Sequence, residues 1–310
     1  MKPTHELIGG ETVILLIGFN RPDFIFNRLM ELDLIKNRNV FISIDWHNLE
    51  TSNEIEETIR NYLKHKKTNS NFDYIIHTVN QGLARHITMT ITKLLETYES
   101  VIVLEDDISI NENSISTFDL GLRFMKTNED IASVGGFSPI GIPSLLHKFN
   151  FLRKSRYFAC WGWATNRSVW NRYRLDIQQE DIAESLRGSV TWARLNDFQK
   201  RTWLGRFHKI QSSNPHTWDF QFQYMCFRYS MENLLPLGRI TENLGFMDKR
   251  SAHTNDARPW WLQVAPLPGY PASVIRGGSL MRSILEWVES KSTIGDNRRQ
   301  RKLGSLSKRS

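Results

Sequence analysis

The segment Val-Ile-Val-Leu-Glu-Asp-Asp, residues 101–107, places four apolar residues directly before three carboxylates, Glu105, Asp106 and Asp107. An apolar run of this length is typical of a strand buried on both faces of a parallel sheet, and ligands of such sheets bind beyond the carboxyl ends of the strands. Three adjacent acids repel one another unless a cation or several donors hold them. Because Mg²⁺ and Mn²⁺ prefer oxygen ligands, the segment favours a divalent metal site. The alternative is a strand that ends in a solvated acidic turn.

The first part of the chain alternates strand and helix signals. Continuous apolar runs predict strands over residues 12–19, 40–44 and 72–77. Apolar stripes at helical spacing predict helices over residues 21–32, 51–64 and 82–98. This rhythm predicts a parallel sheet with right-handed crossovers. The residues that follow the strands, namely Asn20, Arg21, Asp45 and the acidic triplet Glu105, Asp106 and Asp107, should therefore meet at one edge of the sheet.

Two common phosphate-binding motifs are absent from the sequence. No Gly-x-Gly-x-x-Gly follows the first predicted strand, and no Gly-x-x-x-x-Gly-Lys-Ser/Thr occurs anywhere in the 310 residues. These absences disfavour a dinucleotide-dependent oxidoreductase and a P-loop phosphotransferase. A nucleotide, if the protein binds one, must be held in another way.

Aromatic residues become dense over residues 136–261, which contain eight of the ten tryptophans. We expect a smaller, helix-rich half here, in which most tryptophans pack in the core. A helix predicted over residues 217–229 has Asp219 in its first turn, where the helix dipole favours the ionised carboxylate. Residues 262–290 are expected to wrap around the body and to end in a short amphipathic helix with apolar positions Leu280, Ile284, Leu285 and Val288.

The formal net charge of +7 is concentrated at one end of the chain. Residues 291–310 hold seven Lys or Arg and one Asp, so this tail supplies +6 and residues 1–290 supply +1. A nearly neutral body argues against nucleic-acid binding as the main function. The tail is rich in Ser, Gly and Arg, and we expect it to be disordered. Its functional alternative is peripheral contact with an anionic membrane surface.

Targeting and cysteine signals are sparse. No apolar stretch approaches the ~20 residues that span a bilayer, and the first residues lack the apolar segment of a secretory signal. We therefore expect a cytoplasmic protein; the functional alternative for the tail would place the protein peripherally at the inner face of the membrane. Cys160 and Cys226 have neither a metal-ligand spacing nor a disulfide framework and are expected to be small core residues.

Several short segments, spread over residues 12–254, together resemble the N-acetylglucosaminyltransferase I family and its bacterial relatives, which are nucleotide-sugar-dependent glycosyltransferases of the GT-A fold. In the order of the family, they are Phe19-Asn20-Arg21, Ser43-Ile44-Asp45, Ala84-Arg85-His86, residues 103–107, residues 160–163, Thr217-Trp218-Asp219 and Ser251-Ala252-His253. The resemblance implies an α/β, GT-A fold with a mostly parallel central sheet flanked by helices. Residues 1–135 would form the half that binds the nucleotide sugar, and residues 136–261 the aromatic-rich half that holds the acceptor.

The resemblance also implies roles for individual residues. Nucleotide-sugar contacts would come from Arg21, Asp45, His86, Glu105, Asp106, Ser251 and His253. Asp107 would bind Mn²⁺ or Mg²⁺, and Asp219 would be the catalytic base. The chemistry suits these roles, because Asp can accept from a pyrimidine imide N–H and Arg can pair with a carbonyl or a phosphate.

Simpler interpretations compete for two of these residues. His86 is alternatively a capped surface histidine, and Asp219 a helix N-terminal acid. The chain also departs from the family pattern, with Phe220 at the place of a second acid and Ala252 at the place of a serine.

The implied reaction is the inverting transfer of a sugar, N-acetylglucosamine or a related hexose, from a UDP-sugar to a hydroxyl of a glycan or glycolipid. Such a reaction fits the assembly of a cell-surface glycan. Two other classes remain open: a nucleotidyltransferase acting on sugar phosphates, and a carbohydrate-binding protein without catalysis. The first is disfavoured because no Gly-rich basic loop follows the first strand.

Overall fold

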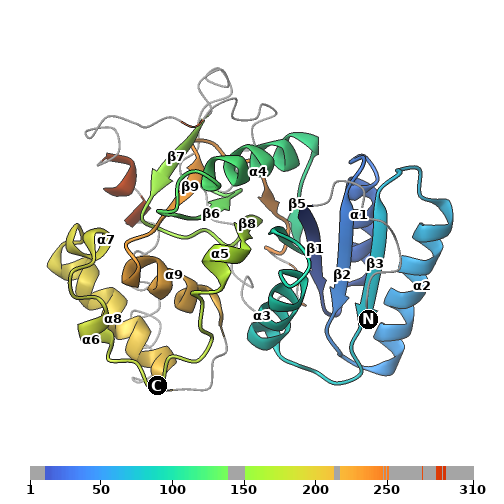
Figure 1. The fold of residues 1–310 in the computed structure, drawn as a ribbon. Helices are drawn as coiled ribbons and strands as arrows, with labels where there is room; N and C mark the ends of the chain where they lie inside the picture. Colours follow the sequence, from blue (N-terminus) through green and yellow to red (C-terminus); the bar gives the residue numbers. More distant parts are fainter. Residues whose placement is uncertain are drawn as a thin grey trace.

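The computed structural model describes residues 11–138, 151–212 and 217–246, and beyond these residues 248, 250, 274, 284–287 and 289–290. The strands, most of them labelled in Figure 1, are β1 Thr12–Gly18, β2 Asn39–Ile44, β3 Asn71–Ile76, β4 Ser100–Glu105, β5 Ile108–Ser109, β6 Ile131–Gly135, β7 Leu152–Ser155, β8 Trp163–Asn166, β9 Glu232–Pro236 and β10 Glu242–Asn243. The helices are α1 Pro22–Leu32, α2 Leu49–His65, α3 Leu83–Leu94, α4 Glu112–Met125, α5 Arg167–Trp170, α6 Ile182–Ser185, α7 Val190–Ala193, α8 Asp197–Gln211 and α9 Asp219–Arg228.

A parallel block of four strands, in the order β3, β2, β1 and β4, forms one side of the main sheet. The register places Ile17 of β1 opposite Ser43 of β2 and Glu105 of β4. The carboxyl ends of these strands therefore lie at the same level, as the alternation of strand and helix signals predicted. Residues 13–16 and 101–104 are buried almost completely, which fits strands covered on both faces.

The helices of this block bury the apolar stripes that the sequence predicted. Ile25 and Leu29 of α1 are fully buried, as are Ile87 and Ile91 of α3. Helix α2 begins two residues earlier than expected, because the side chain of Asn48 caps it by accepting a hydrogen bond from the Thr51 N–H at 2.8 Å. Helix α3 ends four residues earlier than expected, at Leu94.

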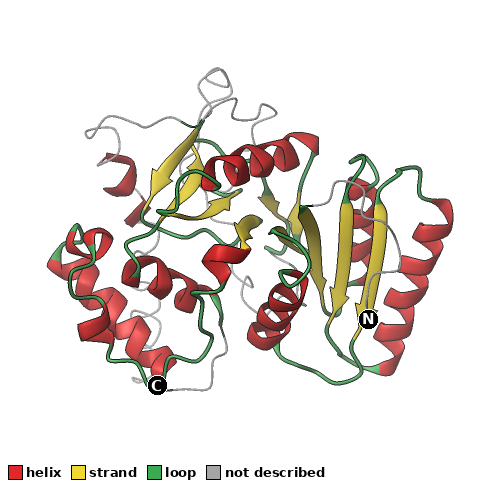
Figure 2. Ribbon diagram, in the orientation of Figure 1, coloured by secondary structure: helices red, strands yellow, loops and turns green. Residues whose placement is uncertain are grey.

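The second part of the chain continues the same sheet. Strand β8 pairs antiparallel with β4 and with β6, β9 pairs parallel with β6, and β7 pairs antiparallel with β9 at the edge. The eight-stranded, mostly parallel sheet flanked by helices confirms the predicted fold class (Figure 2). Because the sheet runs through the expected boundary between residues 135 and 136, the limits of the two halves stay predictions.

Four of the six tryptophans that the structure describes within residues 136–261 are buried, as expected. Trp163 is fully buried and stacks on Trp218, with ring centroids 5.0 Å apart. Helices α8 and α9 enclose a second apolar cluster around Trp203, Phe207 and Phe227. Cys226 is buried in the main core, and Cys160 is partly buried and packs against that core, so the predicted positions of both cysteines are confirmed.

The expected short helix near the C-terminus is present over residues 284–287 and 289–290, which we call the C-terminal helix. Two carboxylate side chains of this helix are buried, and Leu285 is half-buried. Glu286 and Glu289 are buried, whereas Ile284 is 55% exposed; Leu280 and Val288 lie outside the described residues. Within the described ranges, no helix combines the length and the apolar character needed to cross a membrane.

Candidate active site at the carboxyl ends of the strands

The acidic triplet lies where β4 ends. Glu105 is the last residue of β4, and Asp106 and Asp107 form the turn into β5. Strand β5 pairs with β10, and the Leu244 N–H next to β10 donates a 2.8 Å hydrogen bond to the Asp107 carbonyl. A segment from the second part of the chain therefore fixes the backbone of Asp107 from the side opposite to β1.

Arg21 binds two of the three carboxylates from the start of α1. Its Nη2 lies 3.2 Å from Oδ2 of Asp107, its Nε lies 3.2 Å from Oδ2 of Asp106, and Nη2 also pairs with Oδ1 of Asp106. The guanidinium packs over the ring of Phe24, 4.9 Å from its centroid. The remaining nitrogen, Nη1, is buried and has no hydrogen-bond partner within the described part of the chain. One donor of Arg21 is thus available to a ligand oxygen.

The triplet has more negative charge than its surroundings neutralise. Burial, reinforced by the charges of Asp107, Asp106 and Asp219, raises the pKa of Glu105 to about 8. Burial likewise raises the pKa of Asp106 to about 6, although the charge of Arg21 opposes this shift. A further cation near these carboxyl groups would stabilise their ionised form and lower their pKa values.

The chemistry of the triplet fits a Mg²⁺ or Mn²⁺ ion that the substrate helps to hold. No group of three or more His, Cys, Asp or Glu side chains suited to a metal occurs among the described residues. Mg²⁺, however, is usually held by one or two carboxylates together with substrate phosphates and water. The Asp107 side chain keeps 12% of its surface exposed and can therefore serve as such a ligand.

Asp219 lies in the same region as the triplet. It is the first residue of α9, as predicted, is partly exposed, and accepts a hydrogen bond from the Thr217 hydroxyl. The pKa of Cys160 is raised mainly by burial. The negative charge of Asp219 is the second cause, and that of Glu105 is the third. Since Asp219 also raises the pKa of Glu105, its carboxylate and the triplet are within electrostatic reach of one another.

Asp45 and His86 meet at the end of β2. The Asp45 carboxylate accepts backbone hydrogen bonds from Gln81 at 2.8 Å and Gly82 at 3.0 Å, and so holds the turn that precedes α3. His86 is buried, with Nε2 2.7 Å from the hydroxyl of Ser43. Burial lowers the pKa of His86 to about 4. The interpretation of His86 as a surface histidine is therefore wrong, and the imidazole is neutral at pH 7.

Sequence reasoning missed Gly245, which lies against the acidic triplet. A Cβ added to Gly245 would come within 2.3 Å of Oδ2 of Asp107, so a side chain at this position would displace the Asp107 carboxylate. Nothing in the local sequence marks this glycine, because its neighbour Asp107 is distant in the chain.

Arg250 was also missed. Its guanidinium binds Asp23 of α1 at 2.8 and 2.9 Å, and Asp248 at 2.8 Å. The ion pair with Asp23 joins the region after β10 to the start of α1, where Arg21 lies. The two predicted nucleotide-sugar contacts Ser251 and His253 lie outside the described residues.

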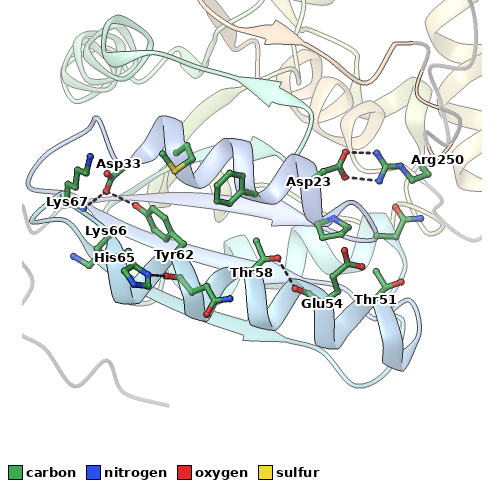
Figure 3. A pocket seen from close by; sticks show the side chains of 15 residues that line it. Asp23, Asp33, Thr51, Glu54, Thr58, Tyr62, His65, Lys66, Lys67 and Arg250 are labelled. Carbon is green, nitrogen blue, oxygen red and sulfur yellow. Dashed lines mark hydrogen bonds and ion pairs between the residues drawn. The ribbon is translucent and has the colours of Figure 1, made fainter.

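A separate groove of about 900 Å³ runs between α1 and α2. Figure 3 shows Asp23, Thr51 and Arg250 at one end and Asp33, Lys66 and Lys67 at the other. The carboxylate of Asp33 is engaged by the Tyr62 hydroxyl and by the backbone N–H groups of Lys67 and Thr68. None of the predicted site residues within the described ranges lines this groove, so it is distinct from the acidic site.

The sheet, with carboxylates at the carboxyl ends of its strands, defines the class of protein: an α/β protein with the GT-A arrangement. The GNT-I family matches residues 18–176, which is more than half of the chain. The chain belongs to the GNT-I family, and the resemblance inferred from the sequence is confirmed. No curated protein matches the chain.

The solved structures that are similar to this chain share little sequence identity with it. The apo form of the glycosyltransferase GlyE from Streptococcus pneumoniae TIGR4 is 12% identical, over 72% of this chain and 45% of that chain, with a TM-score of 0.34. Glucosyl-3-phosphoglycerate synthase from Mycobacterium tuberculosis, in complex with Mg²⁺ and uridine diphosphate, is 10% identical over 52% and 57% of the two chains, with a TM-score of 0.33. 4-Diphosphocytidyl-2C-methyl-D-erythritol synthase from Anaerococcus prevotii DSM 20548 is 9% identical over 55% and 76%, with a TM-score of 0.32. The chain spans less than half the length of GlyE.

Proposed function

We propose that the protein is an inverting, metal-dependent glycosyltransferase that moves a sugar, N-acetylglucosamine or a related hexose, from a UDP-sugar to an acceptor hydroxyl. The observation that carries this proposal is the packing that brings the start of α9 to the end of β4: Trp218, next to Asp219, stacks on Trp163 with ring centroids 5.0 Å apart, and Trp163 pairs with Val103 of β4. A candidate base and a candidate metal-binding acid thus share one region at the carboxyl ends of the strands.

The donor would bind across the ends of β1, β2 and β4. Arg21 offers its unpaired Nη1 to an oxygen of the nucleotide. Asp45 and the neutral imidazole of His86 offer an acceptor and a hydrogen-bonding nitrogen to the uracil edge. Glu105 and Asp106 face the ribose and the donor sugar, where a carboxyl group with a raised pKa can donate as well as accept a hydrogen bond.

Asp107 is the residue that would hold the metal. Mn²⁺ or Mg²⁺ bound there together with the diphosphate would neutralise the charge that grows on the leaving nucleotide. Gly245 lies against Oδ2 of Asp107. Because glycine has no side chain, it does not cover this carboxylate oxygen.

Asp219 acts as the general base on the acceptor. Thr217 donates to Oδ1 of its carboxylate and orients the group, so that Oδ2 is left to take the proton of the attacking hydroxyl. Direct attack with one base inverts the anomeric carbon. The acceptor is a glycan or glycolipid, and the reaction serves the assembly of a cell-surface glycan on the cytoplasmic side.

A donor screen tests the proposal. The purified protein is incubated with Mn²⁺ and with UDP-, GDP- or dTDP-sugars, and release of the nucleoside diphosphate is measured. The proposal predicts release from a UDP-sugar. Release of pyrophosphate from UTP and a sugar phosphate would instead identify a nucleotidyltransferase. Carbohydrate binding without any release would identify a binding protein.

A further inference from the structure

Helix α1 and the turn after it present a row of large apolar side chains to solvent. Phe26, Met30 and Leu34 are 47%, 48% and 61% exposed. They follow one another at intervals of four residues and therefore lie on one side of the helix, where they form a ridge. We call these three residues the α1 ridge. Single exposed apolar residues are common on protein surfaces, whereas a contiguous row is typical of a surface that contacts another molecule.

The α1 ridge borders the groove between α1 and α2. Phe26 and Met30 line this groove from α1, and Thr58 and Asn61 line it from α2. Helices pack by fitting the ridge of side chains on one helix, spaced by four residues, into a groove on another. A ridge that lies beside a groove therefore gives this face the shape to pack against a further helix.

The two ends of the groove carry opposite charges, as Figure 3 shows. Glu54 lies at the end where both helices begin, and Asp23 at the same end is already paired with Arg250. Lys67 lies at the other end, where its backbone N–H donates a 2.9 Å hydrogen bond to Asp33. The side chains of Glu54 and Lys67 are exposed. One end thus offers a carboxylate and the other an ammonium group.

Met30 lies between these two charged ends. The helices run side by side, because the Tyr62 hydroxyl of α2 donates a 3.1 Å hydrogen bond to Asp33, the C-cap residue of α1. Along the helices, Glu54 lies about 12 Å before this contact and Met30 about 4.5 Å before it, at a rise of about 1.5 Å per residue. Lys67 lies beyond the contact. A rotation of 180° about an axis near Met30 therefore exchanges the acidic end and the basic end.

We propose that this face, made of the α1 ridge and the groove beside it, binds the same face of a second copy of the chain about a twofold axis near Met30. The two α1 helices lie antiparallel, and each ridge packs into the groove of the partner. Glu54 meets the partner's Lys67, and Lys67 meets the partner's Glu54. A twofold interface requires a surface that is complementary to itself, and opposite charges at the two ends of an apolar centre meet this requirement. The inference does not depend on the proposed sugar transfer.

Sedimentation velocity of the full-length protein tests the proposal. Wild type is expected to form dimers in the micromolar range. Met30→Asp places two carboxylates near each other at the axis and should weaken the dimer by about 100-fold. Met89→Asp is the matched control, because Met89 of α3 is 57% exposed and lies outside the face, and it should dimerise like wild type. Circular dichroism melts show whether each variant is folded.

A charge exchange tests the antiparallel arrangement itself. Glu54→Lys and Lys67→Glu each place like charges opposite one another, so each variant alone should dimerise about tenfold more weakly than wild type. An equal mixture of the two variants restores opposite charges at both ends and should associate as tightly as wild type. Non-specific association of apolar side chains would not show this recovery.

Three results would overturn the proposal. The first is a wild-type protein that stays monomeric throughout the micromolar range, which would leave the face to a partner of another kind. The second is a Met30→Asp variant that is folded and dimerises like wild type. The third is a mixture of Glu54→Lys and Lys67→Glu that associates no more tightly than either variant alone.

Discussion

Arg21 and Asp107 are joined by an ion pair of 3.2 Å at the carboxyl ends of β1 and β4. The pair places a protein cation on the same oxygen, Oδ2, that the proposed metal would use. Arg21 and the metal therefore compete for one carboxylate when no nucleotide is present. With nucleotide bound, the guanidinium has a second anionic partner, and the two cations can both remain in the site.

The variant Arg21→Met should bind Mn²⁺ alone more tightly than wild type. We expect about a 10–100-fold gain, because a hydrogen bond to a charged group contributes roughly 1.5–3 kcal/mol and metal binding no longer has to break it. The same variant should bind UDP less tightly in the presence of Mn²⁺. Isothermal titration measures both affinities. Arg38→Met removes the pair between Arg38 and Asp119 and serves as the control; equal Mn²⁺ affinity in all three proteins would contradict competition.

The variant Asp219→Asn should lower turnover by about 10²–10⁴-fold, the usual scale for loss of a general base. UDP affinity should not change, because Asp219 is placed on the acceptor. Asp197 is the matched control, since it is the first residue of α8 as Asp219 is of α9. Asp197→Asn should keep full turnover. If Asp219→Asn also turned over at the wild-type rate, Asp219 would be a helix N-terminal acid and nothing more.

Gly245→Ala should disturb the metal-binding carboxylate. The new methyl group would lie 2.3 Å from Oδ2 of Asp107, so one of the two must move. We expect a loss of about 1–3 kcal/mol in the free energy of unfolding, typical of overpacking, and weaker binding of UDP with Mn²⁺. Gly205 of α8 has open space around it, and Gly205→Ala should stabilise the protein by about 0.5–1 kcal/mol. Unchanged UDP binding by Gly245→Ala would remove this glycine from the site.

His86 should make the protein less stable in mild acid. Its pKa is about 4 in the folded protein and about 6.5 in the unfolded chain. Between these values the unfolded chain binds a proton that the folded protein excludes, so stability falls as the pH drops from 6.5 to 4. From pH 7 to 5 this contribution is about 2 kcal/mol. His86→Gln should remove it in urea unfolding, whereas the exposed His65→Gln should not. An equal loss of stability in wild type and His86→Gln would disprove the assignment.

Local patterns in the sequence predicted the parallel block and much of the site. The apolar runs at residues 12–18 and 101–104 are strands because each is buried on both faces. The carboxylates that follow such strands lie at one edge of the sheet, because parallel strands end at the same edge. The place of Asp219 in the first turn of its helix was likewise readable from the spacing of its apolar neighbours.

Features that depend on contacts between distant residues could not be predicted. The backbone donors to Asp45 come from residues 81 and 82, and the residue that approaches Asp107 is Gly245. The burial of Glu286 and Glu289 in the C-terminal helix could not be read from its apolar spacing, because their partners Arg156 and Arg153 lie more than a hundred residues earlier. In each case an interaction across the fold outweighs the local pattern.

The most direct test of the account is a calorimetric titration of UDP, with and without Mn²⁺, into wild-type protein and the variant Asp107→Asn. We predict that Mn²⁺ increases the affinity of wild type for UDP and that the variant loses this increase, because a neutral amide is a poor ligand for a hard cation. Binding of UDP that is equally tight with and without metal in both proteins would contradict the assignment of Asp107 and, with it, the metal-dependent transfer.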